Sequence, residues 1–133
     1  MLFRRRSDQP VMFHRCEHGD QLWHDLAQWY DTDLGQLTRE QEQQQLDTEL
    51  VNLFGYHLLH LGSPADAAML RASRVNHRMR TRLDPDSRAA DRDERGLCLQ
   101  PTALPFTPDS LDVVVLSHVL EFSDDPHTVL REV

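Results

Sequence analysis

A continuous apolar run at residues 113–116, between Asp112 and Ser117, constrains the fold of this chain more than any other segment. The run does not alternate between apolar and polar residues, which is typical of a strand covered on both faces in a parallel sheet. Asp125 and Pro126 follow after a turn, and a carboxylate before a proline at the first helical position predicts a helix. A buried strand followed by a helix predicts an α/β fold with parallel strands.

Residues 56–61 predict the first strand of this sheet, since a short apolar run ends there at Gly62. Ser63 fits the N-cap of a helix and Pro64 its first position, so we expect a helix from this turn to Arg71. The segment therefore predicts a strand, a tight turn and a helix, which is the opening of an α/β unit.

The next strand is expected at residues 75–83, where alternate side chains would point to opposite faces and the arginines would line the wet face. A polar connector covers residues 84–96, and residues 97–99 form a short candidate strand. Together with residues 113–116 these segments make four expected strands, and strands that alternate with crossovers predict a parallel sheet.

Two helices are expected before the first strand. The first begins after Asp20 and ends near residues 33–35, because its apolar residues recur with helical spacing. Those residues are Leu22, Leu26, Trp29 and Tyr30. The second helix begins at Thr38, with Gln41 at the spacing of a capping box, and ends at Gly55. Its expected buried stripe is Leu46, Leu50, Leu53 and Phe54.

The acidic balance of the chain argues against two classes of partner. The formal net charge is −8, so we expect no binding to bare nucleic acid or to an anionic membrane surface. No stretch reaches the roughly 20 apolar residues of a membrane span. Five arginines at residues 71–82 are a local exception, interpreted as a solvated face or one paired with the acids of residues 91–94. Recruitment of an anionic acceptor is the alternative.

The two cysteines, Cys16 and Cys98, are far apart and are interpreted as reduced thiols of a cytoplasmic protein. Cys16 also lies between His14 and His18 at alternate positions, and zinc accepts these ligand types. A closed zinc site needs four ligands, and the sequence offers no partner pair. No metal site is therefore expected.

The last third of the chain carries a longer pattern. It consists of Leu-Pro-Phe at 104–106, Asp-Val-Val at 112–114, His-Val-Leu-Glu at 118–121 and Leu-Arg-Glu-Val at 130–133. In this order the segments resemble the middle of class I methyltransferases that use S-adenosyl-L-methionine, of the type 11 kind. The resemblance implies a Rossmann-like parallel sheet of seven strands, of which residues 56–133 would supply the first four. Residues 1–55 would then be a tail and two helices that cover the site.

The resemblance implies methyl transfer from S-adenosyl-L-methionine to a small-molecule acceptor. Ligands of such sheets bind beyond the carboxyl ends of the strands, so the turns after Leu61 and Leu116 would face each other across the cofactor. The implied cofactor-binding residues are His60, Gly62, Asp84, Gln100, Leu104, Ser117 and His118. His118 is also the candidate catalytic residue, because an imidazole there could orient an acceptor or take its proton. A place in the pocket wall and a structural role are its alternatives.

The turn after the first strand departs from the family pattern of an acid followed by Gly-x-Gly-x-Gly. His60 stands in place of the acid, and Pro64 and Asp66 replace the last two glycines, which removes backbone freedom and one N–H donor. A second hypothesis is therefore a non-enzymatic module with a degenerate cofactor loop that binds or regulates a partner. A dehydrogenase is disfavoured, because no Gly-x-Gly-x-x-Gly follows the first strand.

The fifth to seventh strands of the implied sheet are not present in the sequence. We therefore expect a C-terminally truncated fragment that is inactive by itself. The strand at residues 113–116 would then be an apolar edge, and exposed edges of this kind pair with other chains. Self-association through this edge is expected.

Overall fold

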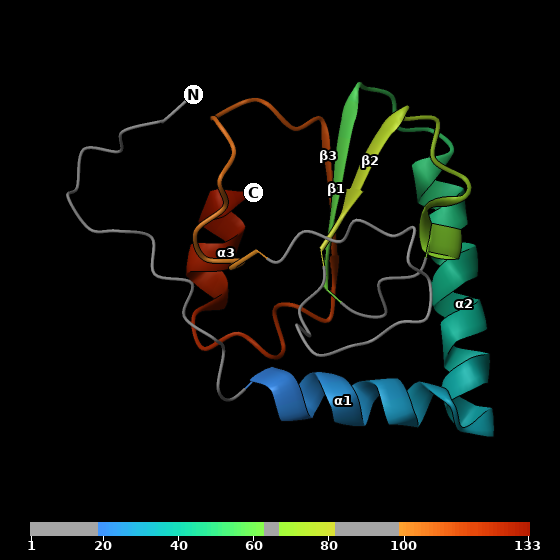
Figure 1. Ribbon diagram of the computed structural model, residues 1–133. Helices are drawn as coiled ribbons and strands as arrows, with labels where there is room; N and C mark the ends of the chain where they lie inside the picture. Colours follow the sequence, from blue (N-terminus) through green and yellow to red (C-terminus); the bar gives the residue numbers. More distant parts are fainter. Residues whose placement is uncertain (1–18, 63–66, 82–98) are drawn as a thin grey trace, which may run out of the picture.

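The computed structural model describes residues 19–62, 67–81 and 99–133 (Figure 1). The helices are α1 (Gly19–Tyr30), α2 (Asp33–Leu50) and α3 (Pro126–Glu132), with a short 3-10 helix, η1 (Ala67–Leu70). The strands are β1 (His57–Gly62), β2 (His77–Arg80) and β3 (Val113–Ser117). The described part combines helices with three parallel strands, so the predicted α/β class is confirmed.

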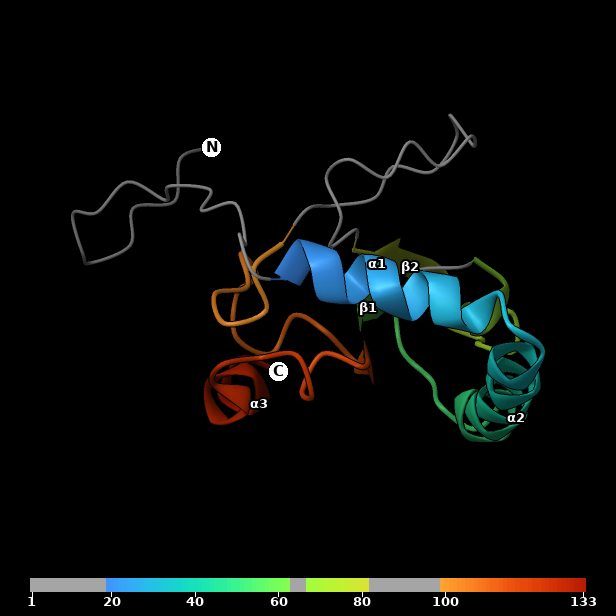
Figure 2. The same cartoon turned by 90° about the horizontal axis from the view of Figure 1, so that it is seen from below.

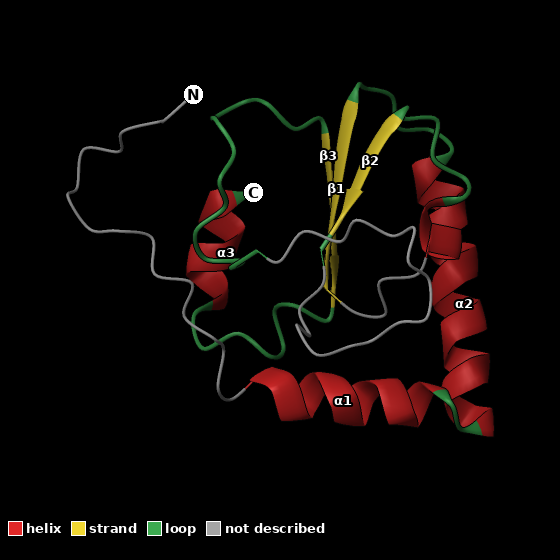
Figure 3. Ribbon diagram, in the orientation of Figure 1, coloured by secondary structure: helices red, strands yellow, loops and turns green. Residues whose placement is uncertain are grey.

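The three strands form one parallel sheet in the order β2-β1-β3, with β1 in the centre (Figure 3). On one side of β1, His60 is in register with Arg80. On the other side, Gly62 is in register with Ser117. Parallel strands end at the same edge of the sheet, so the turns that leave β1 and β3 start from one common edge. We call it the carboxyl edge.

Each face of the sheet has its own apolar core, because successive side chains of a strand point to opposite faces. On one face, Leu59 belongs to a cluster with Val129 of α3. On the other face, Leu58 packs with Leu50 of α2. Figure 1 shows α3 and α2 on opposite sides of the sheet. This burial on both faces explains why residues 113–116 are apolar without alternation.

α1 lies across the carboxyl edge, below the strands in Figure 1, and the view from below in Figure 2 shows it in front of the sheet. Trp23 attaches the first half of this helix to the turn after β3. The indole is 9% exposed and meets the ring of Phe122 edge-on, with 4.9 Å between centroids. The expected helix thus covers the end of the sheet at which α/β folds bind ligands.

The boundaries expected for the second helix were wrong. Thr32, not Thr38, is the N-cap of α2, and its Oγ1 accepts a hydrogen bond of 3.1 Å from the N–H of Gly35. Gly35 lies inside this helix. A glycine is required there because a Cβ would be 2.1 Å from the carbonyl oxygen of Trp29. This close approach lets α2 start directly after α1, five residues before the capping box that the sequence suggested.

The end of α2 also differs from the expectation. The helix stops at Leu50, so Leu53 and Phe54 are 40% and 68% exposed and do not extend the buried stripe. Leu50 itself is 1% exposed and packs on the sheet. After the helix the chain turns at Gly55, with φ of 157°, and enters β1 at His57.

The second expected strand is shorter in the structure. β2 covers His77–Arg80, four residues of the predicted segment 75–83, and Val75 is buried before the strand begins. The helix expected up to Arg71 is represented by η1, and its first residues lie outside the described part. Leu99 is not in a strand, and residues 97–98 are not described. Among the described residues, no helix is both long and apolar enough to cross a bilayer.

Candidate functional site

Gly62 and Ser117, the last residues of β1 and β3, lie against each other at the carboxyl edge. A Cβ at Gly62 would be 1.9 Å from the carbonyl oxygen of Ser117, and the φ of Gly62 is 115°, which L side chains rarely adopt. Glycine is therefore required for this approach of the two backbones. The turns after β1 and β3 begin side by side, as the sequence predicted.

His60 stands where the family pattern has an acid, but its imidazole carries no charge. Its side chain is fully buried, and Nε2 lies 2.8 Å from Oγ of Ser117. Burial, helped by the positive charge of Arg80, lowers the pKa of His60 to about 4. The imidazole is therefore neutral at neutral pH. Its Nδ1 is buried and has no hydrogen-bond partner among the residues that the structure describes.

His118 follows directly in the turn after β3, with a left-handed φ of 58° that is uncommon for a residue with a side chain. Its Nδ1 lies 2.8 Å from Oε1 of Glu121, in the same turn. Its Nε2 lies 2.7 Å from the hydroxyl of Tyr30, the last residue of α1. Oε1 of Glu42, from α2, is 3.5 Å from the same nitrogen. Both ring nitrogens of His118 are thus engaged, and two helices reach it.

Residues 59–133 match the profile of the methyltransferase domain family, and the match covers more than half of the chain. The chain belongs to the methyltransferase family. The matched part includes both turns of the carboxyl edge, whereas α1 and α2 precede it. The resemblance inferred from the pattern in the last third of the chain is therefore confirmed.

A curated relative is the uncharacterized protein YafS of Escherichia coli (strain K12), which is 32% identical to this methyltransferase-family chain over 106 residues. The alignment covers 78% of this chain and 40% of YafS, so the chain spans about two fifths of the length of that relative. No solved structure matches the chain.

The structure brings part of the expected cofactor set of this methyltransferase-family chain to one edge. His60, Gly62, Ser117 and His118 lie there. Leu104 is buried in the same apolar cluster as Leu61, and its N–H donates to Oε2 of Glu132 over 3.0 Å. Gln100 is exposed and forms an isolated bridge with Ala103. Asp84 lies outside the described residues.

The basic segment makes contacts with its surroundings. Arg71 pairs with Asp47 of α2, with 2.6 Å between Nη2 and Oδ2, whereas the acids of residues 91–94 are not described. Nη1 of Arg78 donates to the carbonyl oxygen of Leu70 over 3.0 Å. These contacts agree with a face that is partly ion-paired.

Metal-ligand clusters are absent from the described ranges 19–62, 67–81 and 99–133, where no group of three or more suitable side chains was found. The candidates His14, Cys16 and His18 lie outside these ranges.

Tyr30 and Glu42 were missed as site residues. The sequence places Tyr30 in the apolar stripe of one helix and leaves Glu42 outside the apolar stripe of the next. The hydrogen bond between Tyr30 and His118 joins residues 88 positions apart, and no local sequence pattern predicts such a contact. A buried tyrosine needs a partner for its hydroxyl, which is the signal that could have been followed.

Proposed function

We propose that this chain takes part in the transfer of a methyl group from S-adenosyl-L-methionine to a small-molecule acceptor. The proposal is carried by one observation: in a chain of the methyltransferase family, Gly62 and Ser117 end adjacent parallel strands side by side. Open α/β sheets bind their ligands beyond this edge. Polar groups of three residues, His60, Ser117 and His118, gather there.

The cofactor would be held by His60, Gly62, Asp84, Gln100, Leu104, Ser117 and His118. Two features of the edge fit such a ligand. Gly62 itself carries no side chain, and the buried Nδ1 of His60 has no hydrogen-bond partner among the described residues. One feature fits less well, since His60 offers a neutral ring where the family pattern has a carboxylate.

When bound, the cofactor supplies an electrophilic methyl group on a sulfonium centre. The task of the chain is then to orient the acceptor, since transfer to a good nucleophile depends mainly on positioning. For an acceptor that carries a proton on its nucleophilic atom, His118 is a candidate to receive it when its ring is neutral and one of its present partners has moved away. α1, which lies across the carboxyl edge, would wall the acceptor side.

The second candidate is a non-enzymatic binding module. It is favoured by the neutral, fully buried His60, which ties β1 to β3 through Ser117 and so has a structural explanation without a ligand. In that case the carboxyl edge is closed by protein contacts, and the methyltransferase-like fold serves to present another surface to a partner.

Calorimetric titration of S-adenosyl-L-methionine into the chain distinguishes the two candidates. We expect a dissociation constant in the micromolar range for methyl-group chemistry, and no heat of binding at millimolar cofactor for the module. The variant Ser117→Ala should weaken binding by about tenfold, the cost of one lost hydrogen bond. Ser110→Ala, which changes the serine before the other end of β3, is the matched control and should bind as the wild type does.

A further inference from the structure

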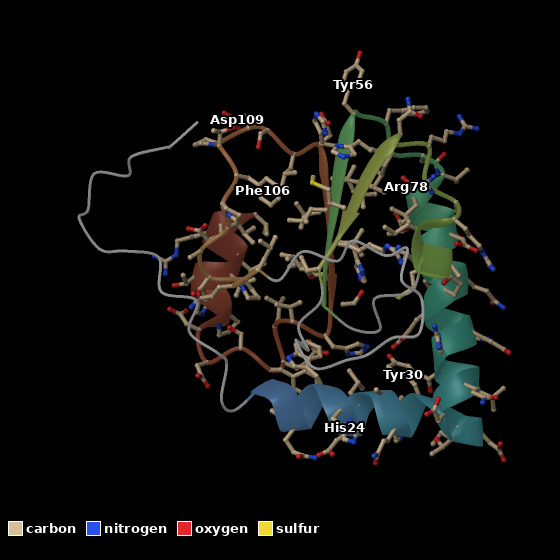
Figure 4. The ribbon with its side chains drawn as sticks, in the orientation of Figure 1. His24, Tyr30, Tyr56, Arg78, Phe106 and Asp109 are labelled. Atoms are coloured by element: carbon tan, nitrogen blue, oxygen red, sulfur yellow. The ribbon has the colours of Figure 1, made fainter. Side chains whose placement is uncertain are left out.

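A chain of short contacts joins α2, α1 and the turn after β3. The hydroxyl of Tyr30 lies 2.7 Å from Oε2 of Glu42 and 2.7 Å from Nε2 of His118. The other ring nitrogen of His118 lies 2.8 Å from Oε1 of Glu121. Tyr30 is 3% exposed, and Figure 4 shows it at the junction of α1 and α2, at the end of the sheet opposite Tyr56.

The number of protons shared among Glu42, Tyr30, His118 and Glu121 decides whether all three contacts are hydrogen bonds. Two carboxylates stand at its ends and supply no proton. Tyr30 supplies one, and a neutral His118 supplies one more, so one of the three contacts would join two acceptors. A doubly protonated His118 supplies the missing proton: Nδ1 then donates to Glu121, Nε2 donates to Tyr30, and the tyrosine hydroxyl donates to Glu42.

Tyr30 is suited to the middle of such a chain. Burial, followed by the hydrogen bond to Glu42 and the charge of that carboxylate, raises the pKa of Tyr30 far above its ordinary value. The hydroxyl therefore keeps its proton across the ordinary pH range. It can accept from one partner and donate to the other at the same time.

The charges around His118 come from several elements. α2 contributes Glu42 and, nearer to Tyr30, the positive charge of Arg39. The turn after β3 contributes Glu121, whose pKa is lowered by its hydrogen bonds, including the one with His118, against the opposing effect of burial. From β1, His60 reaches the neighbouring Ser117 and is neutral. Two carboxylates therefore directly face His118.

We propose that Tyr30 is a positioning residue that holds a doubly protonated His118 and so fastens α1 across the carboxyl edge. Trp23 fastens the same helix two turns earlier through an apolar contact that does not depend on pH. The attachment of α1 at Tyr30, in contrast, depends on the second ring proton of His118. Its consequence for ligand access rests on the proposed function: α1 closes the acceptor side while His118 is positive, and releases it when the proton leaves.

The direction of the pH dependence follows from the proton count. The attachment is complete at a pH at which His118 is doubly protonated and both glutamates are ionised. It weakens as the pH rises, because one contact then joins two acceptors. It also weakens at strongly acidic pH, because the glutamates lose their charge.

Nitrogen NMR of the ring of His118 in the labelled, full 133-residue chain tests the proposal. In the wild type both nitrogens should carry protons near neutral pH. In Tyr30→Phe the proton affinity of His118 should fall by about tenfold, because Nε2 loses its acceptor. Glu42→Gln, at a half-exposed position where misfolding is not expected, should lower the affinity in the same direction. Tyr56→Phe, a 77% exposed tyrosine at the opposite edge, is the matched control.

Two results would overturn the proposal. One is a neutral His118 in the wild type at neutral pH, which would place the third proton on a carboxyl group. The other is an unchanged proton affinity in both Tyr30→Phe and Glu42→Gln. Cofactor titration of the same samples keeps the two proposals apart: a shift in His118 without any cofactor binding refutes the proposed function and leaves the positioning role of Tyr30 standing.

Discussion

Nε2 of His60 lies 2.8 Å from Oγ of Ser117, and this hydrogen bond crosses from the central strand β1 to β3 at the carboxyl edge. The family pattern has an acid at the position of His60. A buried carboxylate without a cationic partner would be costly, whereas a neutral imidazole can bond a hydroxyl without any charge. The exchange therefore changes the chemistry of the edge and makes the stability of the sheet depend on pH.

His60 should make folding less stable in mild acid. Its pKa is lowered from 6.5 to about 4 in the folded chain, so between these values the unfolded chain binds a proton that the folded chain does not. Stability from this group is complete above pH 6.5 and is lost as the pH falls toward 4. In urea unfolding, the contribution of His60 to the free energy should be about 2 kcal/mol lower at pH 5 than at pH 7.5.

The His60→Leu variant isolates this effect from the other histidines. Its unfolding free energy should change less between the same two pH values than that of the wild type. Equal pH dependence in the two proteins would show that His60 titrates normally when folded.

Gly62→Ala should destabilise the chain by at least about 2 kcal/mol, because the added Cβ meets a backbone oxygen and the φ is unfavourable. The clash is with the carbonyl of Ser117, which cannot move without disturbing the β1–β3 pairing. Urea unfolding at pH 7.5 measures the loss. Gln45→Ala, on the exposed face of α2, should stay within about 0.5 kcal/mol of the wild type. A Gly62→Ala variant as stable as this control would contradict the register at the carboxyl edge.

The two tryptophans of α1 should differ in their effect on stability. Trp23 is 9% exposed and packs on Phe122, so Trp23→Ala should cost roughly 3 kcal/mol. Trp29 is 39% exposed, and Trp29→Ala should cost about 1 kcal/mol or less. Thermal and urea unfolding of both variants provide the comparison. A larger loss of stability in Trp29→Ala than in Trp23→Ala would mean that α1 packs through the face that carries Trp29.

Asp112 should stabilise the opposite end of β1. Its Oδ2 accepts hydrogen bonds of 2.9 Å and 2.8 Å from the backbone N–H groups of His57 and Tyr56, which lower its pKa below 3.8. This stabilisation is present above pH 3.8 and is lost as the pH falls through the lowered value. Asp112→Ala should therefore lower the urea midpoint at pH 7. Asp124→Ala, at an exposed aspartate of the turn before α3, should not.

The apolar run of β3 shows why much of the fold could be predicted. A strand between two cores has no polar face, so Val113–Ser117 could be placed in a parallel sheet from its residues alone. Asp125 was likewise recognisable as a cap: its carboxylate accepts from the N–H of Thr128 over 3.0 Å at the start of α3. Both features depend on residues that are neighbours in the sequence, so they can be recognised without the structure.

The start of α2 shows where the prediction failed. Thr32 and Thr38 offer the same side chain, and the spacing to Gln41 favoured the second. The packing of α1 against the beginning of α2 selected Thr32, because Gly35 allows the two helices to approach closely. Propensity is a weak preference, and tertiary contacts override it.

The sequence by itself determined the class of the fold, the buried strands, the family and the glycine at the end of β1, because each depends on the periodicity or identity of neighbouring residues. Only the tertiary structure decided that His60 is neutral, that Tyr30 reaches His118, and that α1 lies across the carboxyl edge. These features depend on burial and on contacts between distant segments, which exist only after the chain has packed.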